Sequence, residues 1–249
     1  MTFRAAPIDV SAWRPQLFGK GNVRNVKDPL IEPLWDGERV LLIVGESVLG
    51  PAETDDGEAA TVPAGGVRAA FIDLDGEELE GPALDLILAE LGDALRADVL
   101  VLDGYLSRQP TSPAPASQQL VKTPTATQFM GQMFFGRRSA RAPRAPTAAG
   151  YAESTDTNVP IAFVAVDLLA IDEQALLEIP LLERKRILDT AFDETHLLRR
   201  SPYVRPPVDS WLIAWRALGF HELAYKSANS HYLPGRQNED WSRIRIPID

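Results

Sequence analysis

The sequence predicts one α+β domain, in which strands and helices follow one another without regular alternation. Apolar runs of strand length, such as residues 40–44 and 99–102, are separated by turn residues, and three other segments have the apolar spacing of helices. The apolar fraction is 45% and the charged fraction 24%, as in ordinary globular proteins. This composition excludes a disordered chain, a collagen-like chain and a coiled coil.

The absence of cysteine excludes disulfides, thiolate zinc sites and cysteine catalysis. The apolar runs are too short to span a bilayer. The N-terminal residues lack the apolar core of a secretory signal. We therefore expect a cytoplasmic location without membrane contact.

The net charge is −10 and is unevenly distributed. Residues 1–100 contain 8 basic and 19 acidic residues, a net −11, whereas residues 101–249 contain 17 and 16, a net +1. Proteins that mainly grip phosphate backbones usually carry a positive excess. The overall field therefore does not attract nucleic acid, although a local basic groove remains compatible with it.

The first half of the domain begins after an irregular lead-in, residues 1–28, and the domain itself covers residues 29–249. Residues 30–44 predict two strands joined as a hairpin at Asp36-Gly37. Residues 67–74 predict a strand closed by a turn at Asp75-Gly76, and residues 82–94 an amphipathic helix in which Gly92 is unfavourable. Residues 98–106 predict a buried strand that ends in a turn at Asp103-Gly104.

The second half begins with an irregular, partly basic segment, residues 107–158, within which residues 129–135 predict a short helix. Residues 161–169 predict a buried strand. A helix is expected at 181–192, with Glu183, Arg184, Lys185 and Arg186 on its exposed side. Another is expected at 208–218, with Trp211 and Trp215 in the core. Residues 222–248 predict a strand, a turn at 233–235 and a final strand.

Four segments between residues 29 and 246 carry short motifs in a fixed order. They read Glu-Pro-Leu-Trp-Asp-Gly-Glu-Arg at 32–39, Leu-Asp-Gly-Tyr-Leu at 102–106, Phe-Val-Ala-Val-Asp-Leu-Leu at 163–169 with Pro-Leu-Leu-Glu-Arg-Lys at 180–185, and Tyr-Leu-Pro-Gly-Arg at 232–236 with Asp-Trp-Ser-Arg-Ile-Arg at 240–245. In that order they resemble the nucleotidyltransferase (adenylation) domain of ATP-dependent DNA ligases. The first resembles the family motif Glu-Pro-Lys-x-Asp-Gly-x-Arg.

This resemblance implies a ligase-type fold, with two antiparallel sheets flanked by helices around a central cleft. Family enzymes usually continue into an OB-fold, for which this sequence offers no segment after the closing motif; a separate chain could supply it. In such enzymes a lysine amine attacks the α-phosphate of ATP and becomes a lysyl-AMP, while carboxylates hold Mg²⁺. The resemblance implies residual nucleotide contacts by Glu32, Asp36, Gly37, Arg39, Lys226, Arg243 and Arg245.

The departures from the family pattern fall at its chemical positions. Leu34 occupies the place of the nucleophilic lysine, and its side chain cannot form a phosphoramidate. Tyr105 and His221 replace the two glutamates associated with the metal, so we expect no metal site. Val166 replaces the aromatic residue that stacks on adenine, and Leu74 replaces an arginine. The sequence therefore predicts no catalytic residue.

The leading hypothesis is a degenerate relative of the ligases that cannot adenylate itself and is retained to bind a nucleotide, DNA or a DNA-repair protein. The nucleotide would be ATP or AMP, with Mg²⁺ only alongside it. One alternative is an active enzyme with a displaced lysine, such as Lys27 or Lys226. Another is an assembly protein whose cleft is filled by its own side chains.

Two local patterns discriminate among these hypotheses. Arg39 either contacts a nucleotide phosphate or is an exposed arginine beside a hairpin turn. Lys226, Arg236, Arg243 and Arg245 either line an anion pocket or protect a solvated strand edge. An open cleft lined by these cations would favour ligand binding, and a cleft filled by the chain's own residues would count against it.

Overall fold

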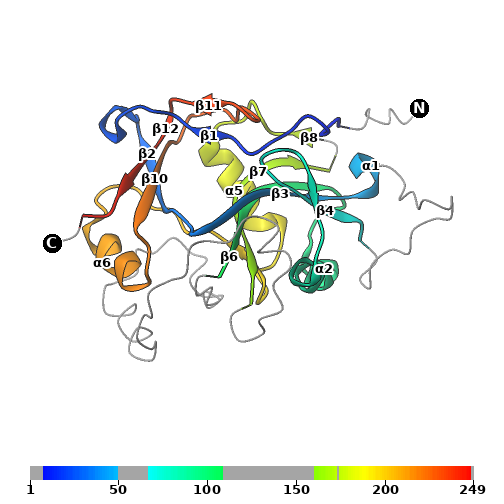
Figure 1. Cartoon of the computed structure of the whole chain (residues 1–249). Helices are drawn as coiled ribbons and strands as arrows, with labels where there is room; N and C mark the ends of the chain where they lie inside the picture. Colours follow the sequence, from blue (N-terminus) through cyan, green and yellow to red (C-terminus); the bar gives the residue numbers. More distant parts are fainter. Residues whose placement is uncertain (1–7, 50–66, 109–159, 173, 248–249) are drawn as a thin grey trace, which may run out of the picture.

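The computed structural model describes residues 8–49, 67–108, 160–172 and 174–247 (Figure 1). Within these ranges the chain forms a seven-stranded sheet, a three-stranded sheet and a two-stranded sheet, together with helices, which confirms the α+β prediction. The helices are α1 (Glu46–Leu49), α2 (Pro82–Ala94), α5 (Leu181–Ala191) and α6 (Asp209–Ala217), and residues Val23–Asn25 form a 3₁₀ turn.

The seven-stranded sheet, called the large sheet below, has the strand order β5-β4-β3-β6-β7-β8, and β9 pairs in parallel with β7. Its other neighbours are antiparallel. The strands are β3 (Gly37–Val44), β4 (Ala69–Ile72), β5 (Glu78–Leu79), β6 (Leu100–Ser107), β7 (Ala162–Ile171), β8 (Gln174–Ala175) and β9 (Leu198–Arg200).

Side chains on the two faces of the large sheet enter separate cores because neighbours along a strand point to opposite sides. Leu42 of β3 packs in a cluster with Leu84 and Ile87 of α2. Leu41, its neighbour, packs in a second cluster that includes Trp241. The central strands are buried on both faces, which explains why they are continuous apolar runs in the sequence.

The three-stranded sheet, called the small sheet below, has the antiparallel order β12 (Trp241–Arg245), β10 (Glu222–Ser227), β2 (Pro29–Pro33). Helix α6 lies beside it (Figure 1) and places Trp215 in a cluster with Ile31 of β2 and Leu223 of β10. Trp215 is fully buried, and its ring centre lies 5.5 Å from that of Trp211. The tryptophans therefore serve the core, as predicted.

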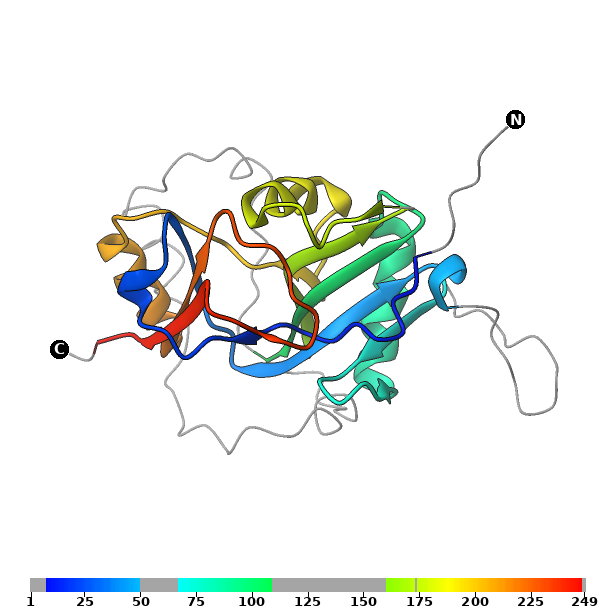
Figure 2. The ribbon, with the colours of Figure 1, turned by 90° about the horizontal axis from the view of Figure 1, so that it is seen from above.

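The N-terminal segment links the two larger sheets on one side of the molecule. It runs from the large sheet toward the small sheet (Figure 2). Within it, β1 (Leu17–Phe18) pairs in parallel with β11 (Gln237–Asn238).

The hairpin predicted at Asp36-Gly37 is wrong, although both of its strands exist. β2 pairs with β10 and β3 pairs with β4 and β6, so residues 34–36 pass from one sheet to the other. Trp35 is buried in this crossing and donates a hydrogen bond from Nε1 to Ser201 Oγ at 2.9 Å. A dipeptide that fits a tight turn does not require one when each strand has a better partner elsewhere.

The turn predicted at Asp103-Gly104 is also wrong, because both residues lie inside β6. A Cβ at Gly104 would lie 2.5 Å from the ring of Phe163 in β7, so glycine permits a close approach of two strands there. The turn predicted at Asp75-Gly76 is confirmed. Gly76 has φ +93°, and Asp73 Oδ1 accepts hydrogen bonds from three following backbone N–H groups.

Helix α2 has the predicted bounds, and α5 and α6 lie within the predicted ranges. One feature of α5 was predicted wrongly: Arg184 and Lys185 are buried, while Glu183 and Arg186 are exposed. Positions 181, 184, 185, 188 and 191 form the buried face of the helix, with the spacing that an apolar stripe would have. The two cations are accommodated there because buried carboxylates lie opposite them.

Several predictions fall outside the described residues, namely the helix at 129–135 and the basic stretch that contains Arg137, Arg138, Arg141 and Arg144. In the described part of the chain, no helix combines the length and the apolar character needed to cross a membrane.

Two glycine-to-alanine substitutions should have opposite effects on stability. Gly104→Ala should lower the free energy of unfolding by about 1–3 kcal/mol, since the new methyl group would overlap Phe163. Gly92→Ala, at an exposed position inside α2, should raise it by about 0.5–1 kcal/mol through helix propensity. Urea denaturation followed by circular dichroism would measure both. Equal stability of the two variants would contradict the close strand approach at Gly104.

Candidate functional site

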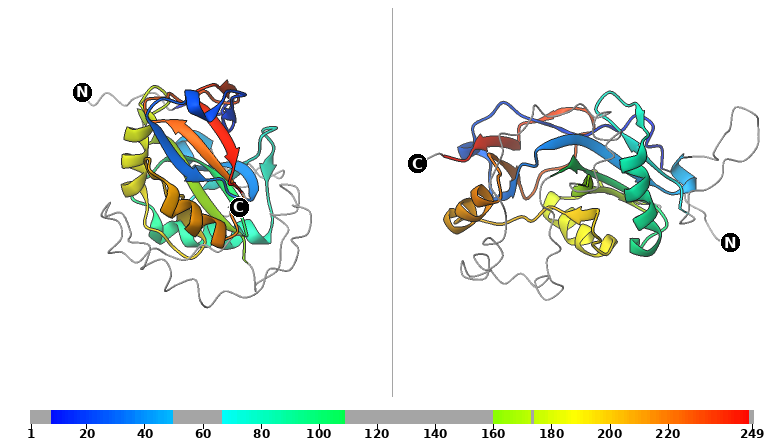
Figure 3. Two further views of the ribbon diagram at one scale, coloured as in Figure 1. Left: turned by 90° about the vertical axis from the view of Figure 1, so that its left-hand side faces the viewer. Right: turned by 60° about the horizontal axis from the view of Figure 1, so that its bottom comes forward.

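The residues matched to the ligase nucleotide site come from both sheets. Glu32 lies in β2 and Lys226 in the neighbouring β10. Arg39 lies in β3 of the large sheet, and its guanidinium carbon is 5.7 Å from the ring centre of Trp241 in β12. Polar side chains of the two sheets therefore approach one another here. Helix α5, which packs against β7 (Figure 3), adds two further buried cations.

Glu32, Lys185 and Lys226 form a buried cluster, called the Glu32 triad below. Glu32 Oε1 lies 2.6 Å from Lys185 Nζ, and Glu32 Oε2 lies 2.9 Å from Lys226 Nζ. Each of the three residues is about 1% exposed. Aromatic faces supplement the carboxylate: Lys226 Nζ lies 4.4 Å from the ring centre of Trp241, and Lys185 Nζ lies 5.4 Å from that of Tyr203.

Two ammonium groups thus share one carboxylate in the interior. Burial opposes ionisation of Glu32, but the charges of Lys185 and Lys226 outweigh it and hold the pKa of Glu32 below its ordinary value. Burial lowers the pKa of Lys185, and the charge of Lys226 adds to that effect. The carboxylate is therefore ionised: its Oε2 accepts a hydrogen bond from Lys226, and its Oε1 lies at ion-pair distance from Lys185 without a hydrogen bond of good geometry.

Arg39 is buried, so the expectation of an exposed arginine beside a hairpin is wrong. Its Nε and Nη2 donate to the two carboxylate oxygens of Asp103, at 2.6 and 2.5 Å. Asp103 also accepts a hydrogen bond from Tyr232 Oη at 2.8 Å. Burial opposes the charge of Arg39, but Asp103 outweighs it and raises the pKa of Arg39. Its guanidinium is engaged within the protein, which leaves it poorly placed to meet a phosphate.

Arg184 and Asp167 form a second fully buried bidentate pair. Arg184 Nε and Nη2 donate to Asp167 Oδ1 and Oδ2 at 2.9 and 2.7 Å. Arg184 Nη1 also donates to the backbone oxygens of Ile179 and Ser230, at 2.5 and 3.1 Å. The pair ties α5 to β7 and to the turn after β10.

Apolar side chains stand at three of the altered positions, Leu34, Leu74 and Val166, and Leu74 is exposed. Leu34 is half-buried and packs against a cluster that contains Val166 and Tyr105. Tyr105 Oη accepts a hydrogen bond from Arg39 Nη1 at 3.2 Å, as expected for a buried tyrosine. His221, at the place of the second glutamate, is exposed. The altered residues thus extend the core or face solvent.

The four cations near the C-terminus do not converge on one pocket. Lys226 is turned toward Glu32, whereas Arg236, Arg243 and Arg245 are exposed. Glu222 lies between the last two, 4.0 Å from Arg243 Nη1 and 3.9 Å from Arg245 Nε. Asp36 and Lys27 are also exposed, and a Cβ at Gly37 would lie 2.0 Å from the Leu106 carbonyl oxygen. Among these candidates only Glu32 and Lys226 form an ion pair with each other, and Arg39 lies near the ring of Trp241 that Lys226 also faces.

The residues present do not fit a magnesium nucleotide bound in the ligase manner. The buried carboxylates of Glu32, Asp103 and Asp167 are each engaged by lysine or arginine. Among the described residues, no three His, Asp or Glu side chains gather closely enough to hold a metal ion.

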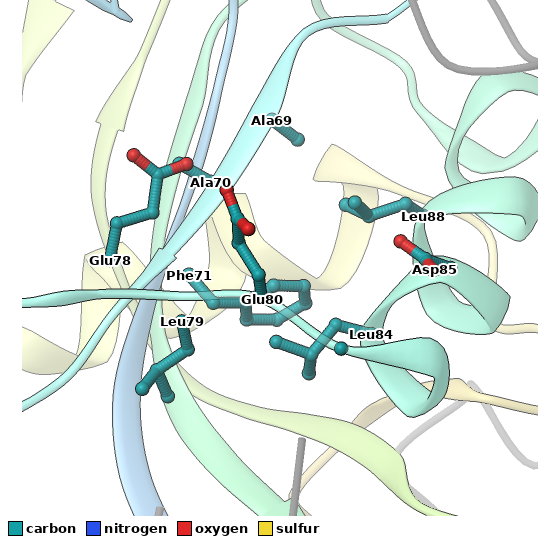
Figure 4. Close-up of a pocket in the computed structure, with 10 residues that line it drawn as sticks. Ala69, Ala70, Phe71, Glu78, Leu79, Glu80, Leu84, Asp85 and Leu88 are labelled. Carbon is teal, nitrogen blue, oxygen red and sulfur yellow. The ribbon is translucent and has the colours of Figure 1, made fainter. Parts of the chain in front are cut away.

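Two pockets are found away from the Glu32 triad. One, of about 300 Å³, lies between β4, β5 and the start of α2 (Figure 4). The other, of about 270 Å³, lies between α6 and residues 246–247. Neither is lined by a residue of the triad.

Sequence reasoning missed Lys185, Arg184 and Asp103 as parts of this region. For the first two a signal existed, because both positions fall on the face of α5 that also carries Leu181 and Leu188. For Asp103 the dipeptide with Gly104 pointed to a turn, and no local pattern indicated its partner Arg39, 64 residues earlier.

The fold is that of the nucleotidyltransferase domain of ATP-dependent DNA ligases. The ligase domain from M. tuberculosis LigD shares it with a TM-score of 0.55 and 19% identity, over 96% of this chain and 61% of that one. A mycobacterial DNA ligase D complexed with ATP and MES gives a TM-score of 0.56 and 19% identity, over 96% and 62%. The chain thus spans about three fifths of each structure. The sequence matches no protein-family model and no curated protein.

Proposed function

We propose that this protein is a ligase-fold protein that does not adenylate itself and that acts by binding a protein partner in DNA repair. The observation that carries the proposal is the Glu32 triad. The carboxylate of Glu32, which would contact adenine, is paired with two buried lysines. In addition, Leu34 stands where the ligases have the nucleophilic lysine.

The energetics of the triad support a filled site. To contact a nucleotide, Glu32 would have to leave Lys185 or Lys226, and separating a buried ion pair costs about 3–5 kcal/mol. Arg39 would likewise have to leave Asp103 to reach a phosphate. The cost of breaking these ion pairs would be subtracted from the binding free energy of a nucleotide and would weaken its affinity.

The positions of the lysines argue against a displaced nucleophile. Lys27 is exposed, and Lys226 is buried and paired with Glu32. Lys185, on the buried face of α5, is paired with the same carboxylate. A nucleophile must be held close to the atom that it attacks, whereas Glu32 holds two of these amines and the third lies on the surface.

A protein partner is favoured over nucleic acid by charge. The net charge is −10, and the exposed Arg243 and Arg245 share Glu222. Proteins that bind DNA through its phosphates usually carry a positive excess, which this sequence lacks. The likeness to DNA ligases supports DNA repair as the setting.

Label transfer from α-phosphate-labelled ATP, with Mg²⁺ or Mn²⁺ and denaturing electrophoresis, would test this proposal. We expect no label on the native protein and none on Leu34→Lys, since a restored amine does not free Glu32. Leu86→Lys, at an exposed position of α2, is the matched control for a new lysine. Label on the native protein would overturn the proposal. Label on Leu34→Lys alone would show that ATP still binds and would overturn the filled site.

A further inference from the structure

The large sheet has an incompletely covered edge at β4. Strand β5 contains only Glu78 and Leu79, and it covers only Phe71 and Ile72 of β4. Ala69, at the start of β4, pairs with Val44 on its inner side, and no strand of the described residues pairs with it on its outer side.

The hydrogen-bond ladder fixes which backbone groups point outward. Gly45 N–H donates to Arg68 O at 2.8 Å, so Arg68 directs its polar groups toward β3. Because directions alternate along an antiparallel strand, Ala69 and Phe71 direct theirs away from β3. Phe71 is opposite Leu79 in β5. The N–H and C=O of Ala69 therefore face the open edge.

The chain leaves this edge because α2 begins too early to cover it. Continuing the β4–β5 register would place Gly81 opposite Ala69. Gly81 O instead accepts from the N–H groups of Leu84 and Asp85, at 2.9 and 3.1 Å, in the first turn of α2. Within the described ranges, the outward groups of Ala69 form no backbone hydrogen bond.

The pocket of about 300 Å³ lies along this edge (Figure 4). It contacts three consecutive residues of β4, Ala69 to Phe71, which is possible only at the side of a strand because side chains alternate between faces. Phe71, Leu84 and Leu88 give it an apolar lining. An extended chain entering here would meet both backbone partners and apolar surface.

The charged residues that line the pocket, among those that the structure describes, are all acidic. Glu78, Glu80 and Asp85 line it, and their side chains are exposed. The half of the chain that contains it, residues 1–100, has a net charge of −11. A segment seated here would be stabilised by basic side chains and opposed by acidic ones.

We propose that this edge groove binds an extended segment of a partner protein in which Arg or Lys alternates with small apolar residues. The segment adds a strand beside Ala69, places its apolar side chains against Phe71, Leu84 and Leu88, and directs its cations to the three carboxylates. The inference rests on the proposed partner-binding function and names the site and chemistry of that partner.

Fluorescence anisotropy with two labelled probes, Arg-Val-Arg-Val-Arg-Val and Glu-Val-Glu-Val-Glu-Val, would test the groove. We expect only the basic peptide to bind, and its binding to slow hydrogen exchange at the Ala69 amide. Ala69→Pro removes the outward N–H without touching the β3 ladder. The double substitution Glu78→Lys, Glu80→Lys reverses the charge of two of the three acidic residues that line the groove. Each change should weaken binding at least tenfold, whereas Glu183→Lys, on the exposed side of α5, should not.

Other outcomes would overturn the proposal. Equal binding of the basic peptide by all variants would indicate general attraction to an acidic protein. If the native chain does not bind the basic peptide, the groove does not take a segment of the proposed kind. Binding that emerges only after replacing Arg137, Arg138, Arg141 and Arg144 by serine would make the chain's own segment the occupant. If analytical ultracentrifugation shows a dimer that Ala69→Pro abolishes, the occupant of the groove is a second copy of this chain. Label transfer from ATP tests the nucleotide site and not the groove, so failure of the proposed function can be told apart from failure of the groove proposal.

Discussion

Replacing Glu32 by glutamine should lower the free energy of unfolding by about 3–5 kcal/mol, because it leaves two buried ammonium groups without a counter-charge. Both oxygens of Glu32 are engaged, and both lysines are buried. A neutral amide can accept a hydrogen bond from one lysine but cannot offset two charges.

Lys226→Met should cost far less than Glu32→Gln, about 1 kcal/mol or less, because it removes the cation that is in excess. One carboxylate and one ammonium group then remain, and the methionine side chain can pack against Trp241. If the sharing of one carboxylate by two lysines is correct, the two variants must differ in this direction. A larger loss for Lys226→Met would contradict it.

The loss caused by Glu32→Gln should diminish at alkaline pH. Burial already lowers the pKa of Lys185, and loss of Glu32 lowers it further, whereas lysines of the unfolded chain keep the ordinary value of 10.5. Between the folded and unfolded pKa values the unfolded chain binds more protons, so the free energy of unfolding rises with pH. Urea denaturation at several pH values up to 10 would measure this slope. A slope no steeper than that of the native protein would count against the triad.

Arg184→Met should destabilise the protein by about 3–5 kcal/mol, because it leaves Asp167 charged and buried without its bidentate partner. Burial opposes ionisation of Asp167, and the charge of Arg184 outweighs it and holds the pKa of Asp167 low. The substitution also removes the hydrogen bonds to Ile179 O and Ser230 O.

Arg186 gives a matched control on the same helix. It pairs with Glu183 at 2.5 Å, but both side chains are exposed. Arg186→Met should leave the urea midpoint unchanged, since exposed ion pairs contribute little. Thermal and urea denaturation of the two variants would compare buried and exposed arginines two positions apart. Equal midpoints would mean that Arg184 is not the buried partner of Asp167.

These expectations share one physical basis. Residues that the sequence associates with a nucleotide, Glu32, Arg39 and Lys226, are instead held by ion pairs within the protein. If the substitutions behave as described, the polar region where the sheets meet serves stability. Recognition of a partner then depends on other surfaces, such as the groove beside Ala69.

Local patterns were sufficient for much of the fold. The apolar spacing of residues 82–94 predicted α2 with its bounds, because a helix records its buried face within a few turns. The continuous apolar runs predicted β6 and β7 in the same way. The ordered motifs predicted the ligase-type fold, and Leu34 is visible in the sequence without any structure.

Strand pairing was decided by tertiary structure. Asp36-Gly37 and Asp103-Gly104 are compatible with tight turns, but β2 pairs with β10 and β6 continues through its glycine. Such pairings join residues far apart in the chain, and no short window of sequence contains both partners. A turn dipeptide therefore predicts what is locally permitted, not which strand becomes the neighbour.

Short segments of the sequence suffice to predict the class of fold, the helices α2, α5 and α6, and the absence of a lysine at position 34, whereas the short helix α1 was not predicted. The partners of the buried charges follow from the tertiary fold. Lys185 on α5 reaches Glu32 in β2, and Arg39 in β3 reaches Asp103 in β6, because folding brings these elements together. Whether a charged side chain meets solvent or a counter-charge depends on what lies opposite it, and that is a property of the folded chain.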